Sequence, residues 1–225
     1  MAFTPYEAAT HALRRARALL ASTALTKRTR IVRVKGRTRA RPWLPVTVAT
    51  DMRRQSVVMA VAALDTYMHS LVITRAYTHG QLPGGLARLE VPFEALLAQA
   101  DEAKEAARKP SHRSRQRVAV KRQLRDRLLQ ETFQNSVGVS RALGMAGLSG
   151  KWKEIGDAMT PAMQPEAIKT RLDEIVRRRN QIVHEGDYER KERPRKAKLT
   201  HMTQSQAIAD IDFIAKLVDA IHVVI

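Results

Sequence analysis

The chain has 225 residues, long enough for one domain with a self-sufficient core. Lys and Arg number 40 against 22 Asp and Glu, and the net charge of +18 favours a polyanion or an acidic protein as partner. Cysteine is absent and the seven histidines show no metal-ligand spacing beside a carboxylate, so we expect no disulfide, metal or cofactor. Without a long apolar stretch, we expect a cytoplasmic protein and no membrane span.

The first predicted element is a helix over residues 5–24. Thr4 is a good N-cap, and Pro5 suits the first helical position. Apolar residues at helical spacing define its expected buried face: Ala9, Leu13, Ala16 and Leu20. The segment is rich in Arg and poor in acids, as organellar transit peptides are, but the cap favours an ordinary first helix.

Residues 30–41 break the helical pattern, because apolar and basic residues alternate there with a period of two. Lys35 and Gly36 lie centrally as a two-residue turn, so we expect a β-hairpin, with a solvated loop as the alternative. The alternation puts one set of residues on a basic side: Arg33, Lys35, Arg37, Arg39 and Arg41. No acid occurs in this arm, so we expect it to contact an anionic partner.

The rest of the chain is helical by period, so the sequence predicts an all-α helical bundle. The segment over about 48–78 carries apolar residues at helical spacing and is the expected central helix. Shorter helices are expected over four segments: 91–109, 111–133, 135–148 and 152–159. In the second of these, Leu128 and Leu129 are both expected to be buried.

The last predicted helix begins with a capping box formed by Thr203 and Gln206. Its expected inward side chains are Ile208, Ile211, Leu217, Val218, Ile221 and Val224. We therefore expect an N-terminal helix and basic arm over 1–47 and a helical domain over 48–225, together forming one compact unit.

The candidate site lies at the end of another helix, in Arg177-Arg178-Arg179-Asn180-Gln181-Ile182-Val183-His184-Glu185-Gly186-Asp187. Arg179 occupies a gap in an apolar stripe, where a buried guanidinium needs an anionic partner, another subunit or a ligand. His184 lies one turn beyond Asn180 on the same face. An arginine, an amide and an imidazole gathered at one helix end indicate chemistry on a phosphate. The alternative is an ordinary helix end, with Gly186 as its C-cap glycine.

The R-N-x-x-x-H element formed by Arg179, Asn180 and His184 resembles the signature of the HEPN superfamily, in particular its RiboL-PSP-HEPN-like branch. The segment Arg53–His69 is similar to the first core helix of that branch, and Trp152 stands where a tryptophan commonly precedes the motif helix. The resemblance spans roughly residues 50–224 and implies an all-α HEPN-like fold. One departure is Asp65, where the branch has Glu.

The resemblance implies a metal-independent endoribonuclease that cleaves RNA by attack of the 2′-hydroxyl. Histidine changes its protonation near neutral pH, so His184 can be the general base or acid. Arg179 can donate to the non-bridging oxygens of the phosphate, and Asn180 can orient the histidine or the phosphate. Asp65 can fix Arg179 or His184, with an ordinary interhelical ion pair as the alternative. Similar enzymes pair two copies, so we expect a homodimer.

RNA is the expected partner, held by a set of basic residues on the arm and around the motif: Arg33, Lys35, Arg37, Arg39, Arg177, Arg178, Arg190 and Lys191. The resemblance further suggests a toxin of a toxin–antitoxin or phage-defence system, with an acidic antitoxin or a nucleotidyltransferase as a second partner. Two other classes remain open. One is a non-catalytic HEPN-like RNA-binding or interaction domain, and the other is a DNA-binding regulator suggested by charge alone.

Overall fold

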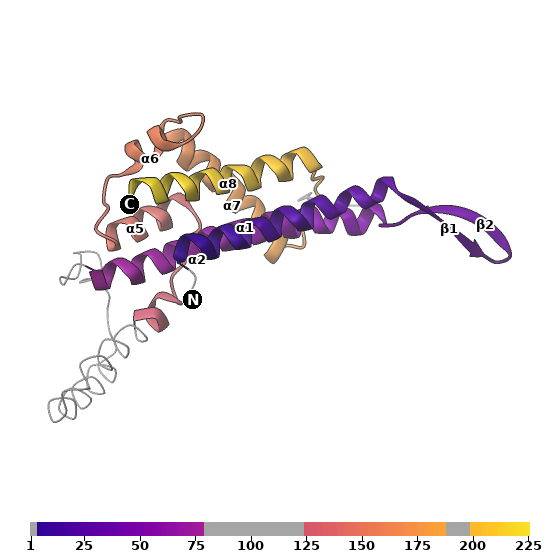
Figure 1. The fold of residues 1–225 in the computed structure, drawn as a ribbon, viewed down its shortest axis with the longest axis horizontal. Coiled ribbons are helices and arrows are strands. Elements are labelled where there is room, and N and C mark those ends of the chain that lie inside the picture. The colour runs from indigo at the N-terminus through magenta and orange to yellow at the C-terminus, as the bar shows by residue number, and fades with distance from the viewer. Residues whose placement is uncertain (1–3, 79–123, 188–198) are drawn as a thin grey trace, which may run out of the picture. The chain divides into compact units, whose positions relative to one another are not determined.

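The computed structural model describes residues 4–78, 124–187 and 199–225. The chain forms two compact units, one of residues 1–64 with 152–225 and one of residues 65–151. The described elements are helices apart from one two-stranded sheet, which confirms the predicted all-α class with a small hairpin (Figure 1). The predicted division of the chain near residue 47 stays a prediction.

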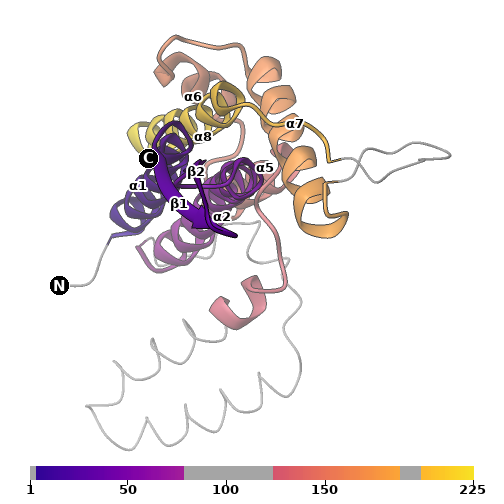
Figure 2. The same cartoon turned by 90° about the vertical axis from the view of Figure 1, so that its right-hand side faces the viewer.

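The first unit contains the N-terminal helix, the hairpin, the motif helix and the C-terminal helix. Its elements are α1 (Pro5–Ser22), the 3₁₀ helix η1 (Thr23–Lys27), β1 (Thr29–Val34), β2 (Arg37–Pro42), the first part of α2 (Val46–Thr78), α6 (Trp152–Ala158), α7 (Pro165–His184) and α8 (Gln204–Val224). α1 packs along α8, and α6 contacts both α7 and α8. Figure 2 shows α1 beside α8 from a direction perpendicular to that of Figure 1.

Both predicted helix starts are confirmed. The Thr4 side chain accepts from the backbone N–H of Glu7 while the Glu7 side chain accepts from the backbone N–H of Thr4. Thr203 and Gln206 form the same reciprocal capping box at α8. The apolar face of α1 is buried as predicted, but Ile208 of α8 is 44% exposed, because its position near the start of α8 faces away from the packed side.

The basic arm is the predicted hairpin, with β1 and β2 antiparallel from the pair Thr29–Pro42 to the pair Val34–Arg37. Lys35 and Gly36 form the turn with φ of 48° and 76°, and two positive φ values are typical of the tight type I′ turn. Figure 1 shows the hairpin projecting beyond the end of α1, away from the helices of its unit.

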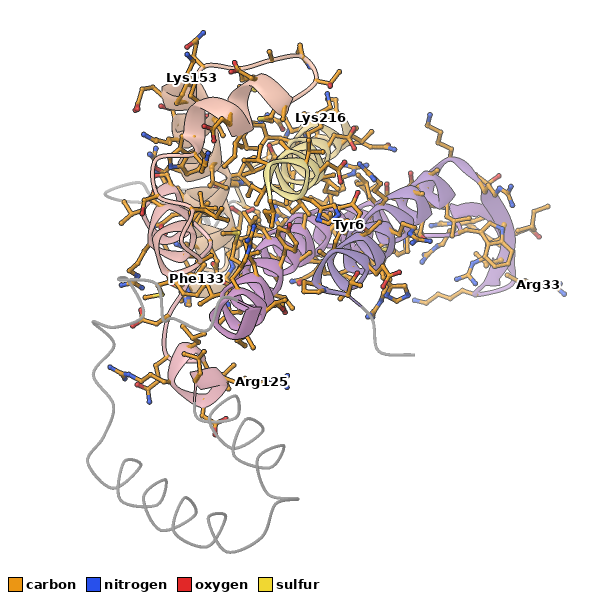
Figure 3. All side chains as sticks on the ribbon, turned by 60° about the vertical axis from the view of Figure 1, so that its left-hand side comes forward. Tyr6, Arg33, Arg125, Phe133, Lys153 and Lys216 are labelled. Carbon is orange, nitrogen blue, oxygen red and sulfur yellow. The ribbon has the colours of Figure 1, made fainter. Side chains whose placement is uncertain are left out.

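The predicted division of the arm into one basic and one apolar side is wrong. Residues directly opposite each other in a ladder lie on the same face, and the pairs here join odd-numbered to even-numbered positions. The face that holds Arg30 therefore also holds three arginines of β2: Arg37, Arg39 and Arg41. Arg33 lies on the opposite face, near the far end of the hairpin (Figure 3). The predicted sides come from counting every second residue straight through the turn. The pairing register reverses that alternation between β1 and β2.

The second unit contains the rest of α2 from Asp65, a helical segment over 124–128 and α5 (Ser136–Met145). Its buried side chains include Tyr67, Met68, Leu71, Val72, Leu128, Phe133, Val139 and Leu143. The expected helix over 111–133 ends at Leu128, and Leu129 is 69% exposed because it lies in the turn that follows. The expected helix over 91–109 lies outside the described residues.

The central helix α2 meets the length and composition of a membrane-crossing helix over Val46–Arg75. Half of this apolar segment is buried within the protein, and the core helix of a soluble protein has the same length and composition. Val57, Val61 and Leu64 are fully buried, as expected from their helical spacing. This buried face packs in the core of the protein, as the apolar face of a core helix does.

Candidate active site

The motif helix α7 ends in a fixed conformation. Ile168, Leu172, Ile175 and Ile182 are buried as predicted and hold one face of the helix in the core. Gly186 follows the helix with φ of 63°, so it takes the left-handed position predicted for a C-cap glycine. The backbone N–H groups of Glu185 and Asp187 both donate to the carbonyl oxygen of Gln181, which closes the last turn.

The three residues of the R-N-x-x-x-H element lie together in the last two turns of α7. Arg179 Nη1 donates to Asn180 Oδ1 at 3.0 Å, so the amide orients the guanidinium. Arg179 Nε is buried and has no hydrogen-bond partner within the described residues. His184 is the last residue of the helix and is exposed. The end of α7 therefore carries both a half-buried arginine and an accessible imidazole.

Asp187 anchors the end of α7 through two arginines. Its carboxylate is 2% exposed, accepts from Arg54 Nε of α2, and lies 2.6 Å from Arg178 Nη1. Both guanidiniums also donate to the carbonyl oxygen of Thr200, at 2.8 Å from Arg54 and 3.1 Å from Arg178. The backbone adds a bond from the Thr200 N–H to the Asp187 carbonyl oxygen, at 2.7 Å. This buried cluster ties α7, α2 and the segment before α8 together.

A family of known proteins matches the chain over residues 41–225, and that family is RiboL-PSP-HEPN. The chain belongs to this family. The match covers the motif helix, the central helix and the C-terminal helix, and it confirms the resemblance noted in the sequence. No curated protein and no solved structure matches the chain. HEPN domains of this kind are known for ribonuclease or RNA-binding roles.

The Asp187 cluster was not predicted, although its members are visible in the sequence. Asp187 stands at the end of the motif segment, and Arg54 stands at the start of the resemblance in α2. The signal that identifies them is their position relative to the HEPN motif, because spacing within either helix does not show that the two segments meet. The cluster also explains why an aspartate occupies a left-handed φ of 60°, a conformation that Asp tolerates better than most residues.

The basic residues expected to hold RNA fall into three groups. Arg33, Lys35, Arg37 and Arg39 are exposed on the arm, and Arg177 is exposed on α7. Arg178 is only 17% exposed on its side chain and is engaged by Asp187 and Thr200, so it fixes the helix end in this structure. Arg190 and Lys191 lie outside the described residues.

Asp65 belongs to the second unit, and its carboxylate has a local partner there. Asp65 Oδ1 accepts from the backbone N–H of Phe133 at 2.7 Å and lies 3.8 Å from His69 Nδ1. The His69 ring nitrogens lie 2.8 Å from the carbonyl oxygens of Asp65 and Leu128, and the ring is tilted against the buried Phe133. A link from Asp65 to the motif therefore stays a prediction.

One depression of about 280 Å³ lies beside the end of α7. Its lining combines the Asp187 cluster with neighbouring residues: Asp51, Arg54, Gln55, Ile182, Gly186, Asp187 and Leu199. Arg179 and His184 are not among them, so the depression belongs to the buried ion cluster. No group of three or more metal-ligating side chains occurs within the described ranges.

Proposed function

We propose that this HEPN protein is a metal-independent endoribonuclease whose catalytic groups are Arg179 and His184. The observation that supports the proposal is that two neighbouring arginines of α7 differ in their ion-pair partners. Arg178 is paired with Asp187, whereas Arg179 has no carboxylate partner within the described residues. A half-buried guanidinium without a counter-anion is costly, and a bound phosphate removes that cost.

The chemistry assigned to these residues needs no other group on the protein. His184 takes the proton from a ribose 2′-hydroxyl, and the resulting oxygen attacks the adjacent phosphorus. The bond from phosphorus to the 5′-oxygen breaks, that oxygen takes a proton from solvent water, and the protonated His184 returns its proton to the solvent. The products are a 2′,3′-cyclic phosphate and a 5′-hydroxyl end. Arg179 donates to the non-bridging oxygens, on which negative charge increases in the transition state.

Asn180 is assigned a positioning role. Its carbonyl oxygen already accepts from Arg179 at 3.0 Å, which limits the rotamers that the guanidinium can take. Asp65 is assigned a supporting role, in which its carboxylate fixes Arg179 or His184; within the second unit it accepts from the backbone N–H of Phe133. Arg177 and the basic arm are assigned to the RNA backbone, where cations provide affinity without reading sequence.

The proposal extends to assembly and context. Two copies pair so that their motif helices share one RNA-binding cleft, and the protein acts in the cytoplasm as a toxin or in phage defence. An acidic antitoxin or a nucleotidyltransferase is then the natural protein partner for a chain with a net charge of +18. The alternative function within the same family is RNA binding without cleavage.

The experiment that tests the reaction type compares an RNA oligonucleotide with an all-DNA copy, each with and without EDTA. The proposal predicts cleavage of RNA alone, unchanged by EDTA, with a cyclic phosphate at the 3′ end of the upstream product. Cleavage of the DNA copy or a requirement for magnesium contradicts the mechanism. Tight RNA binding without any cleavage supports the non-catalytic alternative.

A further inference from the structure

The hairpin register gathers on one face of the arm a different set of basic residues from the one that the alternation in the sequence indicates. The pair Arg30–Arg41 faces the same way as Arg39 and Arg37, which oppose Val32 and Val34. The Trp43 N–H donates to the Arg28 carbonyl oxygen at 2.8 Å, which extends the ladder by one pair. Five arginines and one tryptophan therefore share this face: Arg28, Arg30, Arg37, Arg39, Arg41 and Trp43. We call it the arginine face.

The tryptophan of the arginine face is accessible. Trp43 is 56% exposed, whereas Trp152, the other tryptophan of the chain, is 8% exposed. The guanidinium carbon of Arg30 lies 5.8 Å from the centre of the Trp43 ring, within the range of a cation–π contact. An exposed indole next to several cations offers a flat surface on which a base can stack while the cations contact phosphates.

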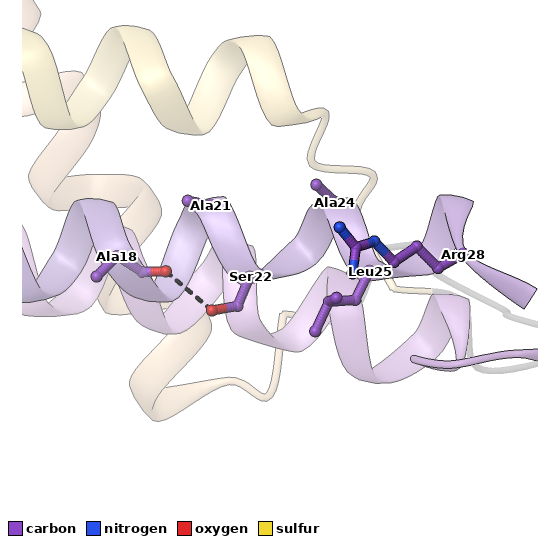
Figure 4. Close-up of a pocket in the computed structure, with 6 residues that line it drawn as sticks. All are labelled: Ala18, Ala21, Ser22, Ala24, Leu25 and Arg28. Carbon is purple, nitrogen blue, oxygen red and sulfur yellow. Dashed lines mark hydrogen bonds between the residues drawn. The ribbon is translucent and has the colours of Figure 1, made fainter.

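The spacing of the cations fits an extended polyanion. Alternate residues of a strand are about 6.8 Å apart, so Arg37, Arg39 and Arg41 form a regular row. No acidic residue occurs between Lys27 and Trp43, and every arginine of the face is exposed. The row ends at the base of the arm, where Arg28 also lines a depression of about 500 Å³ with residues of α1 and η1, among them Ala21 and Leu25. Figure 4 shows the Arg28 side chain turned back toward Leu25.

We propose that the arginine face binds single-stranded RNA, with the arginines on the phosphates and one unpaired base stacked on Trp43. This inference rests on RNA being the substrate class in the proposed function, and it specifies the form of that RNA. A duplex has no unstacked base for Trp43, and the major groove of A-form RNA is too deep and narrow for side chains to read. Aromatic stacking with flanking cations is the recognition mode of single-strand binders.

The test uses fluorescence and affinity together, with oligoadenylate as the probe. Titration with oligoadenylate quenches tryptophan emission in the wild type, and the quench is lost in Trp43→Phe, because the buried Trp152 does not meet the base. Trp43→Ala weakens oligoadenylate binding by roughly 5- to 150-fold, the usual effect of removing one stacking aromatic. Trp43→Phe retains part of the affinity, since a phenyl ring also stacks. Inorganic polyphosphate, which has no bases, binds the wild type without quenching.

Charge is tested with two matched triple variants. Arg37→Gln, Arg39→Gln and Arg41→Gln together remove three cations of the arginine face, and the slope of log K against log salt falls by about 2 for a single strand. The control replaces three exposed arginines that lie outside the arm: Arg14, Arg15 and Arg125. The control removes the same net charge, and its slope stays closer to that of the wild type.

Three results overturn the proposal. They are an unchanged quench in Trp43→Phe, equal effects of the two triple variants, and tighter binding of duplex RNA or duplex DNA than of oligoadenylate. These readouts measure binding alone. A protein that cuts no RNA can still pass them, and a protein that cuts RNA through His184 can still fail them, so the two proposals are tested separately. Circular dichroism of each variant checks that the helices are retained.

Discussion

Asp187→Asn is the substitution that tests how the end of the motif helix is held. The amide keeps the size of the side chain and one acceptor oxygen, and asparagine tolerates the φ of 60° found at this position. The negative charge is lost, so Arg54 and Arg178 remain beside each other without their shared carboxylate. Their side chains are 5% and 17% exposed, so water screens little of the resulting cost.

The expected loss of stability follows from the burial of the two arginines that Asp187 pairs with. Removing one member of a buried ion pair costs about 3–5 kcal/mol of the free energy of unfolding. Asp51 lies 3.0 Å from Arg54 Nη1 but is 64% exposed, so it offsets only part of that cost and we expect the lower half of the range. For a chain of this size the melting temperature should fall by about 6–16 °C. The matched control is Asp212→Asn, which breaks the half-exposed Arg17–Asp212 pair and should cost less than about 1 kcal/mol.

The assay is urea unfolding followed by circular dichroism, with the m-value required to stay constant between variants. A loss for Asp187→Asn that equals the loss for Asp212→Asn would refute the reasoning, because it would show that the Asp187 carboxylate does not hold the helix end. A loss of 3 kcal/mol or more would be a large share of the roughly 5–15 kcal/mol by which domains are stable.

Three further predictions concern packing, pH and assembly. Gly156→Ala should lower the free energy of unfolding by about 1–3 kcal/mol in the same urea assay, because the new Cβ would lie 2.2 Å from the Met163 carbonyl oxygen. Gly144→Ala is the matched control: its Cβ would lie 3.5 Å from Ser149 Oγ, so the variant should be neutral or stabilising. Burial raises the pKa of Asp210 in spite of its ion pair with Arg171, so the folded state favours the protonated carboxyl group. As the pH rises from the ordinary aspartate pKa through the raised one, the wild type should therefore lose stability relative to Asp210→Asn. Sedimentation at micromolar concentration without RNA should give a dimer, and a strict monomer would contradict the shared cleft.

Periodicity and capping residues predicted the helices of the first unit well. The reciprocal bonds of Thr4 with Glu7 and of Thr203 with Gln206 depend on residues three positions apart, so sequence alone shows them. The buried stripe of α7 is equally local, since helical spacing puts its members on one face.

Features that depend on long-range meetings could not be predicted in this way. Asp187 and Arg54 are 133 residues apart, and nothing in either helix reveals that they meet. The arginine face could be identified only from the pairing of β1 with β2. In that pairing, odd-numbered residues of β1 and odd-numbered residues of β2 lie on opposite faces, so Arg33 lies opposite to the face of Arg37. The R-N-x-x-x-H element was recognised by resemblance, whereas the contrast between Arg178 and Arg179 came from three-dimensional contacts.

The central claim is that Arg179 and His184 perform RNA cleavage, and the most direct measurement is single-turnover cleavage of RNA by His184→Ala and Arg179→Ala. Both side chains lie at the end of α7 outside the Asp187 cluster, so the fold should be retained. Each variant should lose about two to four orders of magnitude in rate with little change in RNA affinity. The control is His201→Ala, an exposed histidine outside the motif, which should cut normally. A His184→Ala protein that cleaves RNA at the rate of His201→Ala would contradict the account.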